Sequence, residues 1–219
     1  MNTLPDMLGE SESPRPSFVW RALASTWDTI KVLVVSLAII VPIRAYVAQP
    51  FFVRGASMDP SFYDSEYLII DELSYNLRLQ SPRRGDVVVF RYPLDRSQYY
   101  IKRIVGLPKE RVIIQNGTVT VVNRAFPEGI RIDEGQYLAP GETTDGSVDV
   151  TLRSNEVFVL GDNRDHSSDS RVWGPVPEEL VTGRAWVRVF PIARAGVLVT
   201  PQYGGLVTPL STSAPLPSS

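Results

Sequence analysis

The chain has 219 residues, of which 43% are hydrophobic and 21% charged, and its formal net charge is −2. This composition is ordinary for a folded protein and offers no basic face of the kind that nucleic-acid binding needs. Cysteine is absent and His166 is the one histidine, which excludes disulfides, thiolate metal sites, a cysteine nucleophile and a multi-histidine metal site.

The N-terminal part predicts a flexible lead over residues 1–27, because it is polar and contains three prolines. Residues 28–49 contain the uncharged apolar run Val32–Ile43. Its apolar character surrounds a helix on all sides, which favours lipid over a protein core. The run is shorter than the roughly 20 residues that span a bilayer, but Lys31 and Arg44 can extend to the head groups. We therefore predict a transmembrane anchor at 28–49.

Two other interpretations of this apolar run are a buried core helix and a cleavable signal peptide. A signal peptide would have an unusually long and acidic lead, and cleavage after Ala48 would put Tyr46 where a small residue is wanted. Basic residues flank the run on both sides, so the positive-inside rule does not orient it.

From Phe51 onward the pattern changes to short stretches that are rich in β-branched and aromatic residues and are separated by turn signals. Asn116-Gly117 is a strong hairpin signal, because a type I′ turn needs positive φ at both central residues. The predicted strands are Tyr67–Asp71, Asp86–Arg91, Tyr100–Val105, Arg111–Ile114, Thr118–Val122, Glu156–Leu160 and Ala185–Phe190.

Many short strands without helical periodicity predict a mainly β fold. We expect residues 50–200 to form an antiparallel sheet or partly open barrel, with an inserted β and loop region at 113–155. Residues 201–219 are rich in Pro, Ser, Thr and Gly, which predicts a disordered tail.

Three segments, 55–61, 100–108 and 161–174, concentrate reactive or conformationally special residues. Taken alone, the first is a turn with an available hydroxyl, and most serines in such turns bond their own backbone. The second places Lys102 inside an apolar strand. A buried lysine is normally avoided, so Lys102 either ends an edge strand or has a function.

The third segment could be a self-bonded loop or an oxygen-rich calcium loop. Its acids at 162, 165 and 169 do not follow an EF-hand spacing, and Arg164 and Arg171 would repel the ion. We therefore predict no metal site there.

Together and in this order, the three segments resemble the type I signal peptidase family. The matching patterns are Ser57-Met58-x-Pro60, then Lys102-Arg103-x-x-Gly106-x-Pro108, then Gly-Asp-Asn-Arg-x-x-Ser-x-Asp-Ser-Arg at 161–171. The intermediate stretch 84–90 also matches. The resemblance covers about residues 28–192 and implies a serine endopeptidase that needs no cofactor.

The resemblance implies that Ser57 is the nucleophile and Lys102 its general base. A serine hydroxyl needs an adjacent base, and a lysine can act as one only when burial keeps its amine neutral. His166 falls at a variable position of the third segment, so we expect it to take no part.

The resemblance also implies supporting roles around the dyad. Ser167 would bond and orient the lysine amine, whereas Asp169 with Arg171 and Asp162 with Arg103 would form structural ion pairs. The Ser57 N–H would stabilise the oxyanion. Some family members add a serine hydroxyl two residues earlier, where this chain has Gly55, so the second donor is left open.

Substrates implied by the resemblance are signal peptides of exported preproteins, cleaved after small residues. The pockets would be lined by Met58, Phe62, Tyr100 and Ile101, with Phe51, Val53 and Leu68 near the second pocket. Plain core packing is an equally good interpretation of these residues. An extended substrate would add a strand beside Pro50–Val53.

The expected location is a single-pass protein in contact with membrane lipid, with a cytoplasmic N-terminus and an extracytoplasmic catalytic domain. A self-cleaving repressor-type Ser/Lys protease is an alternative, but the first 27 residues are too short and not basic enough for a DNA-binding domain. A catalytically silent membrane-anchored β module that binds extended peptides is a second alternative, which the complete dyad argues against.

Overall fold

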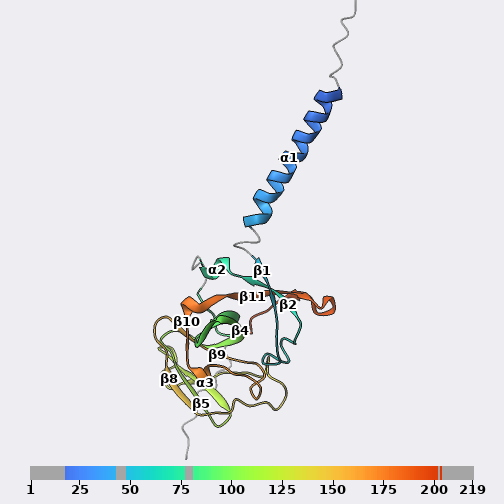
Figure 1. Cartoon of the computed structure of the whole chain (residues 1–219). Coiled ribbons are helices and arrows are strands. Elements are labelled where there is room, and N and C mark those ends of the chain that lie inside the picture. The colour runs from blue at the N-terminus through green and yellow to red at the C-terminus, as the bar shows by residue number, and fades with distance from the viewer. Residues whose placement is uncertain (1–17, 43–47, 77–80, 202, 204–219) are drawn as a thin grey trace, which may run out of the picture. The chain divides into compact units, whose positions relative to one another are not determined.

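The computed structural model describes residues 18–42, 48–76, 81–201 and 203. By its contacts the chain divides into two units, residues 1–43 and 44–219. The first unit contains helix α1 (Phe18–Pro42), drawn in blue in Figure 1. Its large apolar side chains from Val32 to Ile40 are exposed.

The predicted anchor at 28–49 is described only in part. None of the helices in the described ranges combines the length and the apolar character needed to cross a membrane. Residues 43–47 lie outside the described residues, and the next two residues belong to strand β1 (Ala48–Phe52). The predicted segment therefore extends two residues too far, because Ala48 and Gln49 pair with strand β2.

The second unit is mainly β and antiparallel, as predicted, and its strands form two sheets. The larger has eight strands in the order β1-β2-β11-β3-β4-β9-β10, with β12 paired to β11. Its remaining strands are β2 (Tyr67–Asp71), β3 (Val87–Tyr92), β4 (Asp95–Gly106), β9 (Glu156–Leu160), β10 (Val176–Pro177), β11 (Val181–Phe190) and β12 (Gly196–Val197). The short helices are α2 (Leu73–Asn76) and α3 (Ser170–Trp173), with 3-10 turns at Glu178–Leu180 and Ile192–Arg194.

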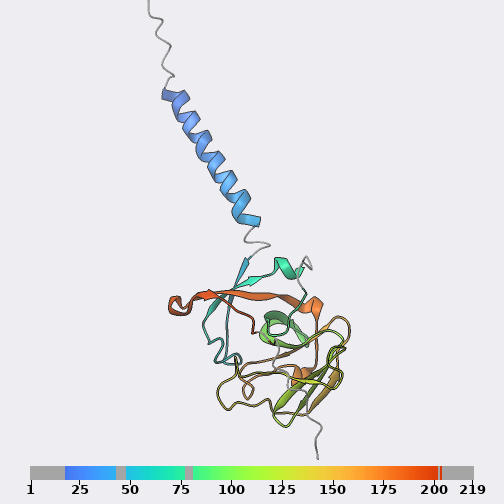
Figure 2. The same cartoon turned by 180° about the vertical axis from the view of Figure 1, so that it is seen from behind.

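The smaller sheet has four strands in the order β7-β6-β5-β8. They are β5 (Arg111–Gln115), β6 (Thr118–Val122), β7 (Ile130–Arg131) and β8 (Val148–Thr151). The hairpin predicted at Asn116-Gly117 joins β5 and β6, with φ of 51° and 72° at these residues. In Figures 1 and 2, β5 and β8 lie at the end of the domain away from β11.

Strand β4 is longer than its apolar pattern predicts, because its first half is exposed and polar. Its pairing with β3 continues out to Tyr92 and Asp95, and this hairpin keeps the polar residues extended. Farther along, Ile101, Ile104 and Val105 enter three different buried clusters. The strand is thus fixed on several sides where it carries Lys102.

The chain after β12 packs back onto the β domain. The Thr200 hydroxyl donates to Asp86 Oδ1 at 2.7 Å. A Cβ at Gly85, where φ is +88°, would lie 2.8 Å from the Tyr203 ring, so a side chain there would collide with it. The other residues of the predicted tail at 201–219, apart from Pro201, lie outside the described residues.

Candidate active site

Ser57 lies on a turn that follows β1. The turn is held in place by the buried Met58 side chain and by hydrogen bonds from the third segment. Met58 is fully buried beneath it, and the Phe62 N–H donates to the Met58 carbonyl at 2.8 Å. From the third segment, the Asn163 N–H donates to the Ser57 carbonyl at 3.1 Å, and its side-chain amide donates to the Ala56 carbonyl at 3.1 Å. The nucleophile turn and the third segment are therefore bonded to each other through the backbone of Ser57.

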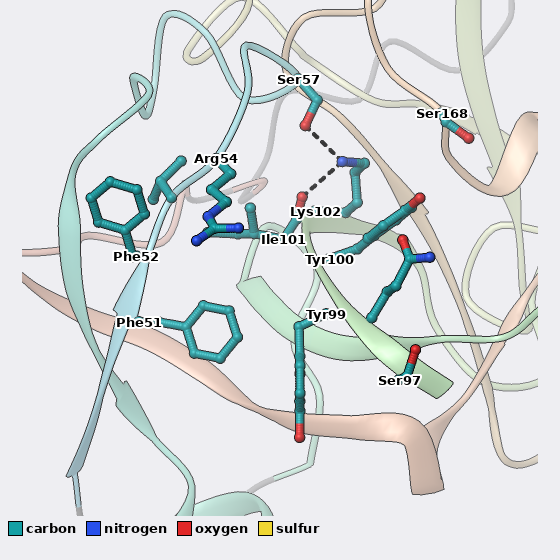
Figure 3. Close-up of a pocket in the computed structure, with 12 residues that line it drawn as sticks. Phe51, Phe52, Arg54, Ser57, Ser97, Tyr99, Tyr100, Ile101, Lys102 and Ser168 are labelled. Atoms are coloured by element: carbon teal, nitrogen blue, oxygen red, sulfur yellow. Dashed lines mark hydrogen bonds between the residues drawn. The ribbon is translucent and has the colours of Figure 1, made fainter. Parts of the chain in front are cut away.

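Lys102 extends from β4 toward Ser57, and the two side chains meet (Figure 3). Its Nζ donates to Ser57 Oγ at 2.7 Å and to the Ile101 carbonyl at 3.0 Å. Only 4% of Lys102 is exposed, and the Tyr100 ring lies 5.5 Å from Nζ. The structure thus brings together the two residues that the sequence selected for nucleophile and base.

Burial changes the acid–base behaviour of Lys102. It lowers the pKa of this amine to about 8, because removal from water disfavours the charged form. The carboxylates of Asp169 and Asp162 act in the opposite direction and limit the shift. A substantial neutral fraction is therefore present near neutral pH, which an exposed lysine does not provide.

Both expected ion pairs are present near the dyad. Arg103 donates to Asp162 through Nε at 2.8 Å and a terminal nitrogen at 2.5 Å, in a buried bidentate contact. Arg171 Nε lies 2.9 Å from Asp169, whose other oxygen accepts from the Gly161 N–H at 3.1 Å. Because Arg103 follows Lys102 in β4, the first pair joins the base strand directly to the third segment.

Ser167 differs from its expected role. Its hydroxyl is buried and has no hydrogen-bond partner among the described residues, so the expected bond to the Lys102 amine is absent from this arrangement. The hydroxyl packs against Gly161 instead, where a Cβ would lie 2.2 Å from Ser167 Oγ and 2.5 Å from the Ser57 carbonyl oxygen. Glycine at 161 allows this close approach.

Arg164 supports the site in a way that the sequence reasoning missed. Its side chain is buried, donates to the Gly161 carbonyl at 2.8 Å and pairs with Glu134 at 2.8 Å. The partner comes from the inserted region 30 residues earlier, so spacing along the chain gave no signal. A buried arginine needs such a partner, and the pair holds the third segment against the insertion.

His166 does not take part in the dyad contact. The residue is exposed, and its Nδ1 lies 3.0 Å from the Asn163 side-chain oxygen.

The Ser57 N–H, the expected donor to the oxyanion, makes no backbone hydrogen bond with a described residue. The Gly55 N–H, by contrast, is engaged by Asp64 at 2.7 Å.

A cleft of about 660 Å³ opens beside the dyad. Of the seven predicted substrate-binding residues, Phe51, Val53, Tyr100 and Ile101 line it. The other three, Met58, Phe62 and Leu68, do not line it. They belong to the buried cluster beneath, because the turn and β2 direct them into the core. For these three, the core-packing interpretation holds.

Two strand edges border the cleft. β1 pairs only with β2 among the described strands. β4 pairs with β3 on one side, and its pairing with β9 begins at Arg103, so residues 97–102 have an open edge. Open strand edges offer backbone donors and acceptors to an extended peptide.

Comparison with known proteins shows which family the chain belongs to. The model of the family "Signal peptidase, peptidase S26" matches residues 26–190. A protein named probable signal peptidase I-2 from Synechocystis sp. is 36% identical over 203 residues, covering 90% of this chain and 85% of its own. Signal peptidase I from Leptolyngbya laminosa is 32% identical over 211 residues, covering 89% and 98%. A crystal structure of a signal peptidase I from Enterococcus faecalis is 27% identical and covers 48% of this chain and 97% of its own, with a TM-score of 0.39. The family match and the relatives from Synechocystis and Leptolyngbya show that the chain belongs to the signal peptidase family, peptidase S26.

Proposed function

We propose that the chain removes signal peptides from exported preproteins with Ser57 as nucleophile and neutral Lys102 as general base. Signal-peptide removal is the activity of the family, and its members are serine endopeptidases. The observation that carries the residue assignment is the 2.7 Å contact between Lys102 Nζ and Ser57 Oγ, with the amine almost wholly buried.

In the acylation step the neutral Lys102 amine takes the Ser57 proton while Oγ attacks the scissile carbonyl. The resulting oxyanion is stabilised by the Ser57 N–H. When the tetrahedral intermediate collapses, the protonated amine gives its proton to the departing amino group, and the signal peptide stays on Ser57 as an ester. Lys102 then deprotonates a water molecule, which hydrolyses the ester and restores both side chains.

The substrate would lie as an extended strand in the cleft, between the edges of β1 and β4. Main-chain hydrogen bonds to these edges would supply sequence-independent affinity. Phe51, Val53, Tyr100 and Ile101 would contact its side chains. The apolar lining beside Ser57 is compatible with small residues before the cleaved bond, as the family resemblance implies.

The protein would act as a single-pass membrane protein, with the part of the predicted segment that precedes β1 as its anchor, the N-terminus cytoplasmic and the β domain extracytoplasmic. The exposed apolar side chains of α1 support an association with lipid. Protease added to intact right-side-out vesicles should degrade the β domain. Protection of the domain in those vesicles, with degradation in inverted ones, would contradict the orientation.

The dyad is tested by Ser57→Ala and Lys102→Ala in the detergent-solubilised full chain, with a preprotein as substrate. Each variant should lose cleavage by a factor on the order of 10³ or more, because each removes one half of a coupled unit. Ser97→Ala, a cleft hydroxyl bonded to Asp95, and Lys109→Gln, an exposed lysine, are matched controls. Cleavage by both dyad variants at the wild-type rate would refute the assignment.

A further inference from the structure

Arg54 stands at the wall of the cleft, three residues before Ser57, on the segment that joins β1 to the nucleophile turn. Figure 3 shows its guanidinium between Phe52 and Ile101, within the group of side chains that line the cleft. The Arg54 Cζ lies 5.9 Å from the centre of the Phe52 ring. The side chain therefore presents a positive charge to the space that a bound peptide would occupy.

No carboxylate among the described residues neutralises this charge in an ion pair, although Asp64 is near enough to interact with it electrostatically. Arg54 is exposed and forms no ion pair with a carboxylate of the described residues. Asp64, on the same turn, is occupied by the Gly55 N–H at 2.7 Å and the Ser65 hydroxyl at 2.9 Å. These two bonds are the main cause of the lowered pKa of Asp64, and Arg54 contributes less.

The rest of the lining carries no charge in the free enzyme when Lys102 is in its neutral form. It consists of aromatic and aliphatic side chains, serines and Gln98, together with Lys102. Lys102 must be neutral to act as a base. The Asp95 carboxylate accepts from the Ser97 hydroxyl and the Gln98 side-chain amide, each at 2.7 Å, and does not itself line the cleft. Among the described lining residues, Arg54 is thus the one whose side chain stays charged whether Lys102 is protonated or neutral.

We propose that Arg54 is a specificity-determining residue, which favours substrates with an acidic side chain close to the scissile bond and disfavours a basic one there. The inference rests on the proposed function, since it assumes that the peptide lies in this cleft. A carboxylate in the bound segment would gain an ion pair with a free guanidinium, whereas a lysine or arginine would meet a like charge. Because Arg54 is exposed and screened, the expected preference is modest, about 1.5- to 5-fold in kcat/KM for acid over its neutral amide at low salt.

The experiment uses the full chain in detergent and one preprotein-derived peptide, whose small residues at the first and third positions before the bond are kept. Asp, Asn or Lys is placed in turn at each other position flanking the bond, and kcat/KM is measured for every peptide. Wild type, Arg54→Gln and Arg54→Glu are compared. Arg91→Gln is the matched control, because Arg91 is also an exposed arginine near a ring, 5.6 Å from the Tyr99 centre, but does not line the cleft.

In wild type and Arg91→Gln, one position or two adjacent ones should show the order Asp, Asn, Lys, from fastest to slowest. The order should flatten in Arg54→Gln, reverse in Arg54→Glu, and weaken in wild type at high salt. Each comparison is a ratio within one variant, so a general loss of activity cancels. Equal Asp-to-Lys ratios in wild type and Arg54→Gln at every position would overturn the proposal. Failure of the dyad is a separate outcome, visible as cleavage by Ser57→Ala.

Discussion

The pH dependence of cleavage tests the proposed base through the protonation state of a single amine. A lysine in water has a pKa of 10.5, and burial brings that of Lys102 to about 8. Only the neutral form can accept the Ser57 proton, so kcat/KM should follow the neutral fraction of the free enzyme. That fraction falls about tenfold for each pH unit below the pKa.

The magnitude follows directly from this shift. With a pKa of about 8, the neutral fraction is about 50% at pH 8, about 9% at pH 7 and about 1% at pH 6. An unshifted lysine would be about 0.03% neutral at pH 7, so burial enlarges the competent population about 300-fold. Exposing Lys102 to water at pH 7 would therefore lower kcat/KM by up to about 300-fold, because the neutral amine would become that much rarer.

The assay measures kcat/KM from pH 5 to 9 for the solubilised full chain, with a peptide that does not titrate in this range. The logarithm should rise with a slope of about one and level off above pH 8. Lys109→Gln, which removes an exposed lysine, should give the same profile. A rate that stays constant from pH 5 to 9, or one that still rises about tenfold between pH 8 and 9, would refute the reasoning.

Two further predictions concern the residues around the dyad. Asp162→Asn leaves Arg103 buried without its countercharge, so the free energy of unfolding in urea should fall by about 3–5 kcal/mol. Asp149→Asn in the exposed pair with Arg111 should change it far less, because solvent screens that pair, and equal effects of the two substitutions would contradict this account. His166→Ala should cleave a preprotein at a near-normal rate, because the ring is exposed and bonds to Asn163. A loss on the order of 10³ in that variant would point to a histidine base instead.

Local patterns predicted much of the β domain. Alternation and β-branched residues located β2, β6 and β9 with their observed bounds, and Asn116-Gly117 located the turn between β5 and β6. Strands with weak patterns were missed, such as β7 and β8. They have only two and four residues, too few for a clear pattern, and become extended because neighbouring strands pair with them.

The lining of the cleft could not be separated from the core by sequence. Met58 and Ile101 both lie in apolar surroundings, yet Met58 is fully buried while Ile101 reaches the cleft. The difference depends on which way the turn faces after it is bonded to Asn163. The missing bond of Ser167 has a similar origin, because its hydroxyl position is set by close packing against Gly161.

By itself the sequence determined the identity and order of the reactive segments, and with them the family and the pair Ser57 and Lys102. Tertiary structure decided that the two side chains meet. Lys102 lies 45 residues after Ser57 in the chain. Its strand β4 is held in the middle of the sheet because Lys102 pairs with Val88 of β3 and Arg103 pairs with Leu160 of β9. The low pKa is a property of this surrounding, because desolvation depends on every group that excludes water from the amine and no local pattern encodes it.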